Sequence, residues 1–251
     1  MRLDRLNAME QYVLEKGTAS LEDLAQKFEV STNTVRRDLI DLLKRGKMTK
    51  VYGGVSAING QAPVPISVRT MKNNQSKQII GQMASTLVTD NMSIFLDSGS
   101  TTACILPYLA AKSNVTVITH SLTALYEAAK YPDLRVIALG GLYNAATSSY
   151  VGVSTLEALS RMTIDLVFIA ATGVSIESGL TNTTFFEVEI KRSVTSLNKR
   201  VVLMADHTKF DHNALLSFCK FSDLAAVVTD VAPSERYLEN IAQNNIQLLC
   251  P

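Results

Sequence analysis

Cysteine and long apolar runs are both scarce in this 251-residue chain. Its three cysteines, Cys104, Cys219 and Cys250, are an odd number without the spacing of a metal site. No apolar run approaches the roughly 20 residues that a membrane helix needs. The first residues lead into a charged amphipathic segment rather than a signal peptide. We therefore expect a cytoplasmic protein whose cysteines are core or incidental residues.

A strong net charge is also absent. The 24 Lys and Arg residues almost balance the 23 Asp and Glu residues, which leaves a formal net charge of +1. Any binding of nucleic acid must therefore come from charge that is concentrated in one part of the chain. With 47% hydrophobic and 19% charged residues, the composition favours a packed core over disorder. The length suits one large domain or two smaller ones.

The first 56 residues predict three helices and a small β-hairpin. Apolar residues at helical spacing indicate helices before Gly17, from Ser20 and from Ser31, with Ser20 and Ser31 placed to cap their helices. Residues 47–55 then predict a hairpin. Residues 31–55 include six Lys or Arg residues and only two Asp residues, which gives a local charge of +4 in a nearly neutral protein.

The first turns of the third predicted helix carry polar and basic side chains. Arg and Asn make bidentate contacts to base edges, and hydroxyl groups bind phosphates or bases. Two helices joined by a short turn, followed by a basic hairpin, favour DNA binding over a merely solvated face. The predicted DNA-binding residues are Ser31, Thr32, Asn33, Thr34, Arg36, Arg37, Lys47, Lys50 and Tyr52.

Residues 57–76 predict a linker, because Asn59-Gly60, Pro63 and Pro65 disfavour regular structure there. The expected domains are therefore a DNA-binding domain at 1–56, this linker, and a second domain at 77–251. Three basic residues near the boundary are either solvated or close to DNA phosphates, and the sequence leaves this open: Arg69, Lys72 and Lys77.

From residue 77 onward, apolar runs that predict strands alternate with segments that predict helices. Continuous apolar strands between helices indicate a mostly parallel sheet that is covered on both faces. Ligands bind such sheets at the carboxyl ends of the strands. A helix is expected over residues 102–111. Pro107 within it predicts a kink or a later start, because proline is tolerated only in the first turn of a helix.

Small and hydroxyl-bearing residues follow these predicted strand ends. After the strand at 93–97, a Gly and hydroxyl loop opens a predicted helix, an arrangement that holds phosphate through free backbone N–H groups. Lys209 would bring a cation to the same edge. Alternatively these are plain turn residues, and Asp97 caps the helix or binds a sugar hydroxyl. The predicted effector-binding residues in these loops are Asp97, Ser98, Gly99, Ser100, Thr101, Thr102, Gly140, Gly141, Thr172, Gly173 and Lys209.

Glu187 and Lys191 lie four residues apart on a predicted helix. They form either a surface ion pair of little value, or a pair that contacts the ligand's hydroxyl groups or charge. Both are included in the predicted effector site, although spacing alone leaves the choice open. The histidines have no metal-like spacing, so we predict no metal and no other cofactor.

Several blocks of sequence resemble the DeoR/GlpR family of bacterial transcriptional regulators. Residues 30–39, Val-Ser-Thr-Asn-Thr-Val-Arg-Arg-Asp-Leu, with Val51-Tyr52-Gly53-Gly54-Val55, are similar to that family's winged helix-turn-helix. Residues 97–102, 140–141, 168–173, 179–181, 187–192 and 206–210 are similar to successive blocks of its sensor domain. The resemblance implies a sensor fold like that of ribose-5-phosphate isomerase, glucosamine-6-phosphate deaminase and CoA transferases. His120 departs from the family, which commonly has Asn there.

The expected fold is therefore an N-terminal winged helix-turn-helix and a mostly parallel α/β sensor domain. The expected function is a transcriptional regulator, a repressor of a sugar or sugar-alcohol catabolic operon that a phosphorylated sugar metabolite releases from its operator. Two-fold symmetry of operators favours a homodimer or homotetramer. The alternative is a sugar-phosphate isomerase or deaminase with an accessory N-terminal domain, since fold does not fix function. A DNA-binding scaffold with a vestigial ligand site is a third hypothesis.

Overall fold

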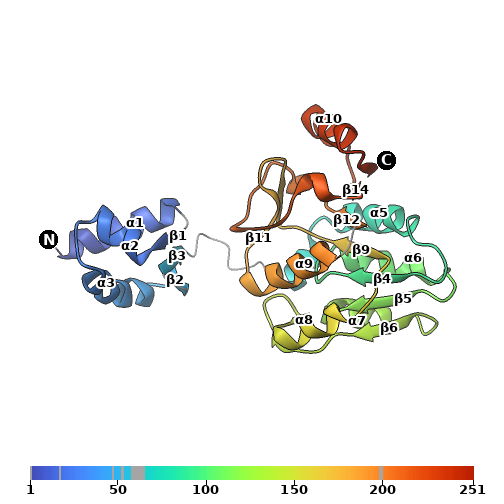
Figure 1. Cartoon of the computed structure of the whole chain (residues 1–251), viewed down its shortest axis with the longest axis horizontal. Helices are drawn as coiled ribbons and strands as arrows, with labels where there is room; N and C mark the ends of the chain where they lie inside the picture. The colour runs from blue at the N-terminus through green and yellow to red at the C-terminus, as the bar shows by residue number, and fades with distance from the viewer. Residues whose placement is uncertain (1, 17, 47, 52–53, 58–65, 198–199) are drawn as a thin grey trace. The chain divides into compact units, whose positions relative to one another are not determined.

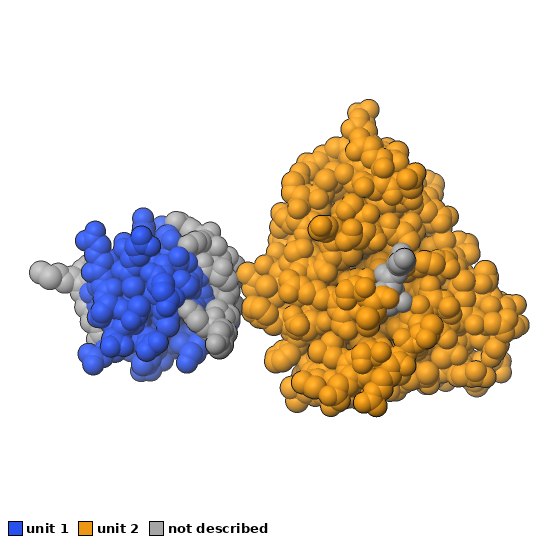
Figure 2. Space-filling view, viewed as in Figure 1, with its two compact units in different colours: residues 1–62 blue, residues 63–251 orange. Residues whose placement is uncertain are grey.

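The computed structural model describes residues 2–251 except 17, 47, 52–53, 58–65 and 198–199. The chain divides into two compact units, residues 1–62 and residues 63–251 (Figures 1 and 2). The division lies within the stretch that the sequence predicts as a linker. Each unit has a hydrophobic core of its own.

The first unit contains three helices and a three-stranded antiparallel sheet. The helices are α1 (Arg2–Lys16), α2 (Leu21–Lys27) and α3 (Thr32–Lys44), and the strands are β1 (Thr18–Ser20), β2 (Met48–Val51) and β3 (Gly54–Ala57), in the order β1-β3-β2. The predicted helices and hairpin are confirmed. Strand β1 was not predicted, because three residues are too few to show an alternating pattern.

Side-chain caps fix where α2 and α3 begin. Ser20 Oγ accepts from the backbone N–H of Asp23 at 2.9 Å, and Asp23 Oδ2 accepts in return from the N–H of Ser20 at 3.3 Å. Ser31 Oγ accepts from the N–H of Thr34 at 3.2 Å. Both predicted caps are thus confirmed. Buried Val35, Leu39 and Leu42 turn one side of α3 into the core, so its polar side faces solvent.

The second unit is built on a seven-stranded sheet in which every adjacent pair is parallel. Its strands are β4 (Ser93–Leu96), β5 (Thr116–Thr119), β6 (Arg135–Ala138), β9 (Leu166–Ile169), β12 (Val201–Met204), β14 (Ala226–Val228) and β15 (Gln247–Leu249). Their order is β15-β14-β12-β9-β4-β5-β6 (Figure 1). The predicted mostly parallel sheet is confirmed. Strand β4 lies between β9 and β5, so the loop after it is central at the carboxyl edge.

Helices cover both faces of this sheet, as predicted. They are α4 (Ile66–Met71), α5 (Asn74–Ser85), α6 (Leu106–Leu109), α7 (Leu122–Ala128), α8 (Val153–Ser160), α9 (Phe185–Leu197) and α10 (Glu235–Gln243). Ile94 and Leu96 pack in one core with residues of α5, α6 and α7. Phe95, between them, packs in the other core with residues of α8, α9 and α10. Alternate side chains of β4 thus serve opposite layers.

In the second unit, the structure departs from the predicted elements in three respects. Helix α4 and the start of α5 occupy residues that were assigned to the linker. The helix expected over 102–111 is a 3-10 turn, Thr102–Ile105, followed by the short α6, which has Pro107 in its first turn. Two small antiparallel sheets were not predicted, because their strands are only three or four residues long: β7 (Leu142–Asn144) with β8 (Ser149–Val151), and β10 (Gly173–Ser175) with β11 (Gly179–Asn182) and β13 (Leu216–Cys219).

Candidate nucleic-acid interface and candidate effector site

The exposed side of α3 carries the predicted DNA-contacting residues. Asn33, Arg36 and Arg37 are exposed there, and Lys50 is exposed on β2. Arg36, Arg37 and Lys50 have no ion pair among the residues that the structure describes, so their charges are free for phosphates or bases. Lys47 and Tyr52 lie outside the described residues. The hydroxyl groups of Ser31 and Thr34 already share a hydrogen bond, with their oxygens 3.0 Å apart. They therefore have less hydrogen-bonding capacity left for DNA.

Other basic side chains of this unit are held by acids. Arg45 Nη1 lies 2.7 Å from Glu10 Oε2 and 3.0 Å from Asn7 Oδ1 on α1. Arg5 Nε donates to buried Asp38 Oδ2 at 2.8 Å, which ties α1 to α3. These two pairs take one cation and one anion out of the local balance of residues 31–55, which therefore stays at +4. The remaining cations lie on α3 and the hairpin.

Residues 97–102 form a tight loop at the carboxyl end of β4. Thr102 Oγ1 donates to the carbonyl oxygens of Asp97 and Gly99, each at 2.8 Å, and so holds the loop's carbonyl groups. A Cβ atom on Gly99 would come within 2.4 Å of Ala170 Cβ, so no other residue fits without a shift.

Four consecutive backbone N–H groups in this loop, those of residues 98–101, have no acceptor among the described residues. Unpaired buried N–H groups are rare in proteins. A run of such groups forms a concave binding site for an anion. The loop therefore has the chemistry of a phosphate site, although the helix that follows it is shorter than the sequence predicted.

Asp97, the first residue of this loop, forms a buried ion pair with Lys191. Asp97 Oδ2 accepts from Lys191 Nζ at 2.5 Å and from the Ala170 N–H at 3.2 Å, and Lys191 also donates to the Ala170 carbonyl at 2.8 Å. Burial raises the pKa of the Asp97 carboxyl, but Lys191 and His120 outweigh burial and hold that pKa well below its usual range. Asp97 is therefore ionised at neutral pH.

Glu187 of α9 also contacts the loop. It is buried, and its Oε1 accepts from Ser98 Oγ at 3.3 Å. Its Oε2 accepts from Thr184 Oγ1 at 2.9 Å and Asn182 Nδ2 at 3.3 Å. Asn182 in turn accepts from Thr172 Oγ1 at 2.6 Å. Glu187 and Lys191 are thus not a surface ion pair: both are buried, and each contacts a residue of the loop that follows β4.

Other predicted effector residues are not joined to this loop by the contacts that the structure describes. Gly140 accepts from Thr155 Oγ1 at 2.8 Å, and Gly141 has a φ of +147° with Thr155 packed against it. Gly173 packs against the backbone of His212. Lys209 follows β12, and its ammonium group has no hydrogen bond or ion pair with a described residue. A role for these residues in effector binding stays a prediction.

His120 lies beside Asp97, although it was noted in the sequence only as a departure from the family and was not among the predicted effector residues. One nitrogen of its buried ring is hydrogen-bonded to the backbone. Nδ1 lies 2.8 Å from the Tyr150 carbonyl oxygen and must donate to it. The other nitrogen, Nε2, lies 3.7 Å from Asp97 Oδ1, and neither atom has a hydrogen bond among the described residues. Its position directly after β5, where a polar residue follows a strand end, was the signal available in the sequence.

Lys77 was also misjudged from the sequence, which suggested a solvated or DNA-contacting side chain. It is buried, and its ammonium group donates to the carbonyls of Arg69 and Lys72 at the end of α4. Burial lowers the pKa of Lys77, and nearby Asp206 opposes that effect. Asn73 Nδ2 donates to Asp206 Oδ1 at 3.2 Å. The Lys77 contacts hold the end of α4, and the Asn73 contact connects the turn after α4 to the segment before Lys209.

Comparison with known protein families covers nearly the whole chain. Residues 5–61 match the DeoR-like helix-turn-helix domain, and residues 72–231 match the DeoR C terminal sensor domain. This chain belongs to the DeoR family.

Relatives of this DeoR-family regulator match it from end to end. It is 38% identical over 246 residues to the HTH-type transcriptional regulator IolR of Bacillus subtilis (strain 168), covering 98% of each chain. It is 27% identical over 247 residues to the glycerol-3-phosphate regulon repressor of Escherichia coli (strain K12), again covering 98% of each. The likeness therefore includes both units.

Solved structures resemble parts of the regulator more distantly. Ribose 5-phosphate isomerase A from Methanocaldococcus jannaschii has 21% identity and a TM-score of 0.42, with 55% of each chain covered. The eIF2B beta subunit from Chaetomium thermophilum has 15% identity and a TM-score of 0.48, with 68% of this chain and 54% of that chain covered. Scores at this level carry no argument about function.

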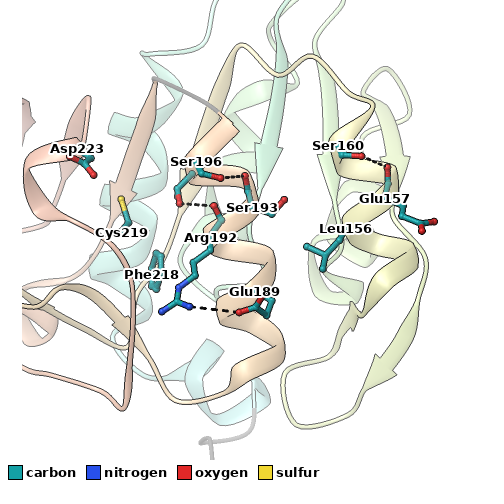
Figure 3. Close-up of a pocket in the computed structure, with 11 residues that line it drawn as sticks. Leu156, Glu157, Ser160, Glu189, Arg192, Ser193, Ser196, Phe218, Cys219 and Asp223 are labelled. Carbon is teal, nitrogen blue, oxygen red and sulfur yellow. Dashed lines mark hydrogen bonds and ion pairs between the residues drawn. The ribbon is translucent and has the colours of Figure 1, made fainter.

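A separate groove of about 710 Å³ lies along the outer side of α9 (Figure 3). It is lined by Leu156 of α8, Glu189 and Arg192 of α9, and Phe218 and Cys219 of β13. None of the predicted effector residues lines it. Helix α9 thus has two different sides, since Glu187 and Lys191 are buried toward the Asp97 loop while Glu189 and Arg192 are exposed.

Among the residues that the structure describes, no group of three or more His, Cys, Asp or Glu side chains is arranged to hold a metal ion. No helix in the same part of the chain has the length and apolar character needed to cross a membrane.

Proposed function

We propose that this DeoR-family chain is a repressor of a sugar or sugar-alcohol catabolic operon, released from its operator by a phosphorylated sugar metabolite. The observation that carries the proposal is the run of four unpaired N–H groups at residues 98–101, directly after the buried, ionised Asp97. One relative is itself named for the glycerol-3-phosphate regulon, which supports a phosphorylated effector.

The effector's phosphate would bind the N–H groups of residues 98–101, with the hydroxyls of Ser100 and Thr101 beside them. Amide donors and hydroxyl groups suit phosphate oxygens, and a Lys ammonium adds a point charge. Lys209 would supply that charge. Gly99 is required because a Cβ there would meet Ala170.

The effector's hydroxyl groups would lie toward Asp97, His120 and Glu187. Asp97 Oδ1 is a buried carboxylate oxygen without a hydrogen bond, and a sugar hydroxyl is the donor that it lacks. His120 Nε2 lies beside it and would contact the same or a neighbouring hydroxyl. Because negative carboxylates repel phosphate, the two ends of the effector bind in one orientation.

Binding rather than turnover is favoured by the state of the two carboxylates. An isomerase needs a base whose pKa lies near the working pH. Lys191 holds the pKa of Asp97 well below its usual range, so Asp97 is a weak base. Glu187 already accepts from three side chains, those of Ser98, Asn182 and Thr184. Both groups suit the recognition of a hydroxyl better than the removal of a proton from carbon.

The operator would be bound through α3 and the hairpin of each subunit of a homodimer or homotetramer in the cytoplasm. Exposed Asn33, Arg36 and Arg37 would contact base edges and phosphates, while Lys50 would contact the backbone. Subunit symmetry matches the two half-sites of an operator.

A thermal-shift screen of the full-length protein tests this proposal. Glycerol-3-phosphate and phosphorylated aldoses, ketoses and sugar alcohols are each compared with the unphosphorylated compound. A ligand that binds only the folded protein raises the melting temperature. We expect a shift with one phosphorylated compound, none with its unphosphorylated form, and no conversion of the ligand by chromatography. Turnover would support the enzyme alternative, and no shift with any phosphorylated compound would contradict an effector site.

A further inference from the structure

Helix α3 exposes one apolar side chain among its polar ones. Ile40 is 56% exposed, and among the side chains of the first unit whose burial is described it is the single large apolar one that is exposed. It lies four residues after Arg36 and seven after Asn33, which are both exposed. Residues at this spacing share one side of a helix. Ile40 therefore belongs to the side of α3 that carries the proposed DNA contacts.

Ile40 opens onto a hollow of about 440 Å³ between α3 and the hairpin. Leu21, Leu43 and Val55 make much of its wall apolar, and Arg36 and Lys50 add two cations to the lining. An apolar protein partner would leave these two charges without counterparts. A DNA duplex would supply phosphates and base edges for them.

We propose that Ile40 reads the C5-methyl group of a thymine in the operator. The thymine methyl is the apolar group that base edges present in the major groove, where it is met by apolar side chains. Arg36, one helical turn earlier, would contact a base edge or phosphate beside that thymine. This inference rests on the proposed DNA-binding role of α3, and it adds a base preference that the cations alone do not give.

Replacement of single thymines by uracil tests the inference, because uracil lacks only the methyl group. A binding duplex is first selected from a random pool with the full-length protein, and affinities are then measured by fluorescence anisotropy at fixed salt. Burial of one methyl group is expected to change affinity by about fourfold. The wild type should lose about that factor at one thymine of each half-site. Ile40→Ala should bind the unmodified duplex more weakly and lose nothing further on that replacement, with Ile40→Val intermediate.

Lys44→Ala is the matched control, since Lys44 lies one turn further along the exposed side of α3. This variant should keep the full uracil penalty. The inference is overturned if no thymine replacement weakens wild-type binding, or if Ile40→Ala, shown folded by circular dichroism, keeps the wild-type penalty. It is also overturned if Ile40→Ala changes only subunit association, which would assign the hollow to a protein contact. Failure of the wild type to bind any selected duplex would instead contradict DNA binding by α3, and the inference with it.

Discussion

At the scale of single residues, the regulator depends on charges that are buried at the loop 97–102. A buried carboxylate is costly unless it is paired and hydrogen-bonded. Asp97 meets that requirement at one oxygen, through Lys191 and the Ala170 N–H, and leaves the other oxygen without a partner. The paired oxygen stabilises the fold, and the free oxygen is the part of Asp97 that a ligand would satisfy.

Removing the ammonium group of Lys191 tests whether the ion pair with Asp97 stabilises the fold. Lys191→Met leaves the Asp97 carboxylate buried and unpaired, which costs about 3–5 kcal/mol of unfolding free energy. Urea unfolding of the full chain measures the loss. The double variant Asp97→Asn, Lys191→Met removes both charges and should recover much of it. A Lys191→Met protein as stable as the wild type would show that the pair is not formed.

The same carboxylate makes stability depend on pH. The pKa of Asp97 in the folded protein lies below its ordinary value of 3.8, so the folded state holds the charged form more strongly than the unfolded state does. Its contribution is fully present above about pH 5 and is lost as the pH falls further. The difference in unfolding free energy between wild type and Asp97→Asn should therefore shrink from pH 7 to about pH 3.

A surface substitution provides the comparison for this pH series. Asp133 is exposed, and its side chain has no hydrogen bond or ion pair with a described residue. Urea unfolding of Asp133→Asn should follow the wild type across the whole range. A constant gap between wild type and Asp97→Asn at all pH values would rule out a strongly held Asp97 charge.

At the scale of elements, the sequence predicted the long and regular parts well. The parallel strands are uninterrupted apolar runs, and α2 and α3 begin at serine caps that the sequence displays. The 3-10 turn after residue 101 and the short strands β7, β8, β10 and β11 were not predicted, because elements of three or four residues are too short to show a periodic pattern. The burial of Lys77 and the approach of His120 to Asp97 likewise need the folded arrangement, since no local pattern encodes them.

Within α3, the capping residue Ser31 and the proposed DNA-contacting residue Asn33 can be tested separately. Ser31→Ala removes the acceptor for the Thr34 N–H and should lower stability by about 1 kcal/mol. Asn33→Ala, two residues on, leaves the cap intact, so stability should hold while operator affinity falls. Hydrogen exchange across residues 32–44 and anisotropy with a labelled duplex measure the two effects. Equal loss of stability in both variants would contradict this division of roles.

At the scale of the whole molecule, the regulator combines two units of different chemistry. The smaller unit carries free cations on α3 and the hairpin, and the larger carries the loop of unpaired N–H groups. If the effector lowers operator affinity by some factor, the operator must lower effector affinity by the same factor. Helix α4 is the first helix of the larger unit, and hydrogen bonds of Lys77 and Asn73 connect its end to the rest of that unit, so we expect it to take part in that coupling.

Release of a labelled operator duplex by a phosphorylated sugar is the most direct test of the central claim. The full-length wild type and Gly99→Ala are each bound to the duplex, and anisotropy is followed as phosphorylated sugars and their unphosphorylated forms are added. We predict that one phosphorylated compound releases the wild type and its unphosphorylated form does not. Gly99→Ala should stay bound, because its new Cβ meets Ala170 and shifts the loop. Equal release by the unphosphorylated sugar, or an unchanged response of Gly99→Ala, would contradict the account.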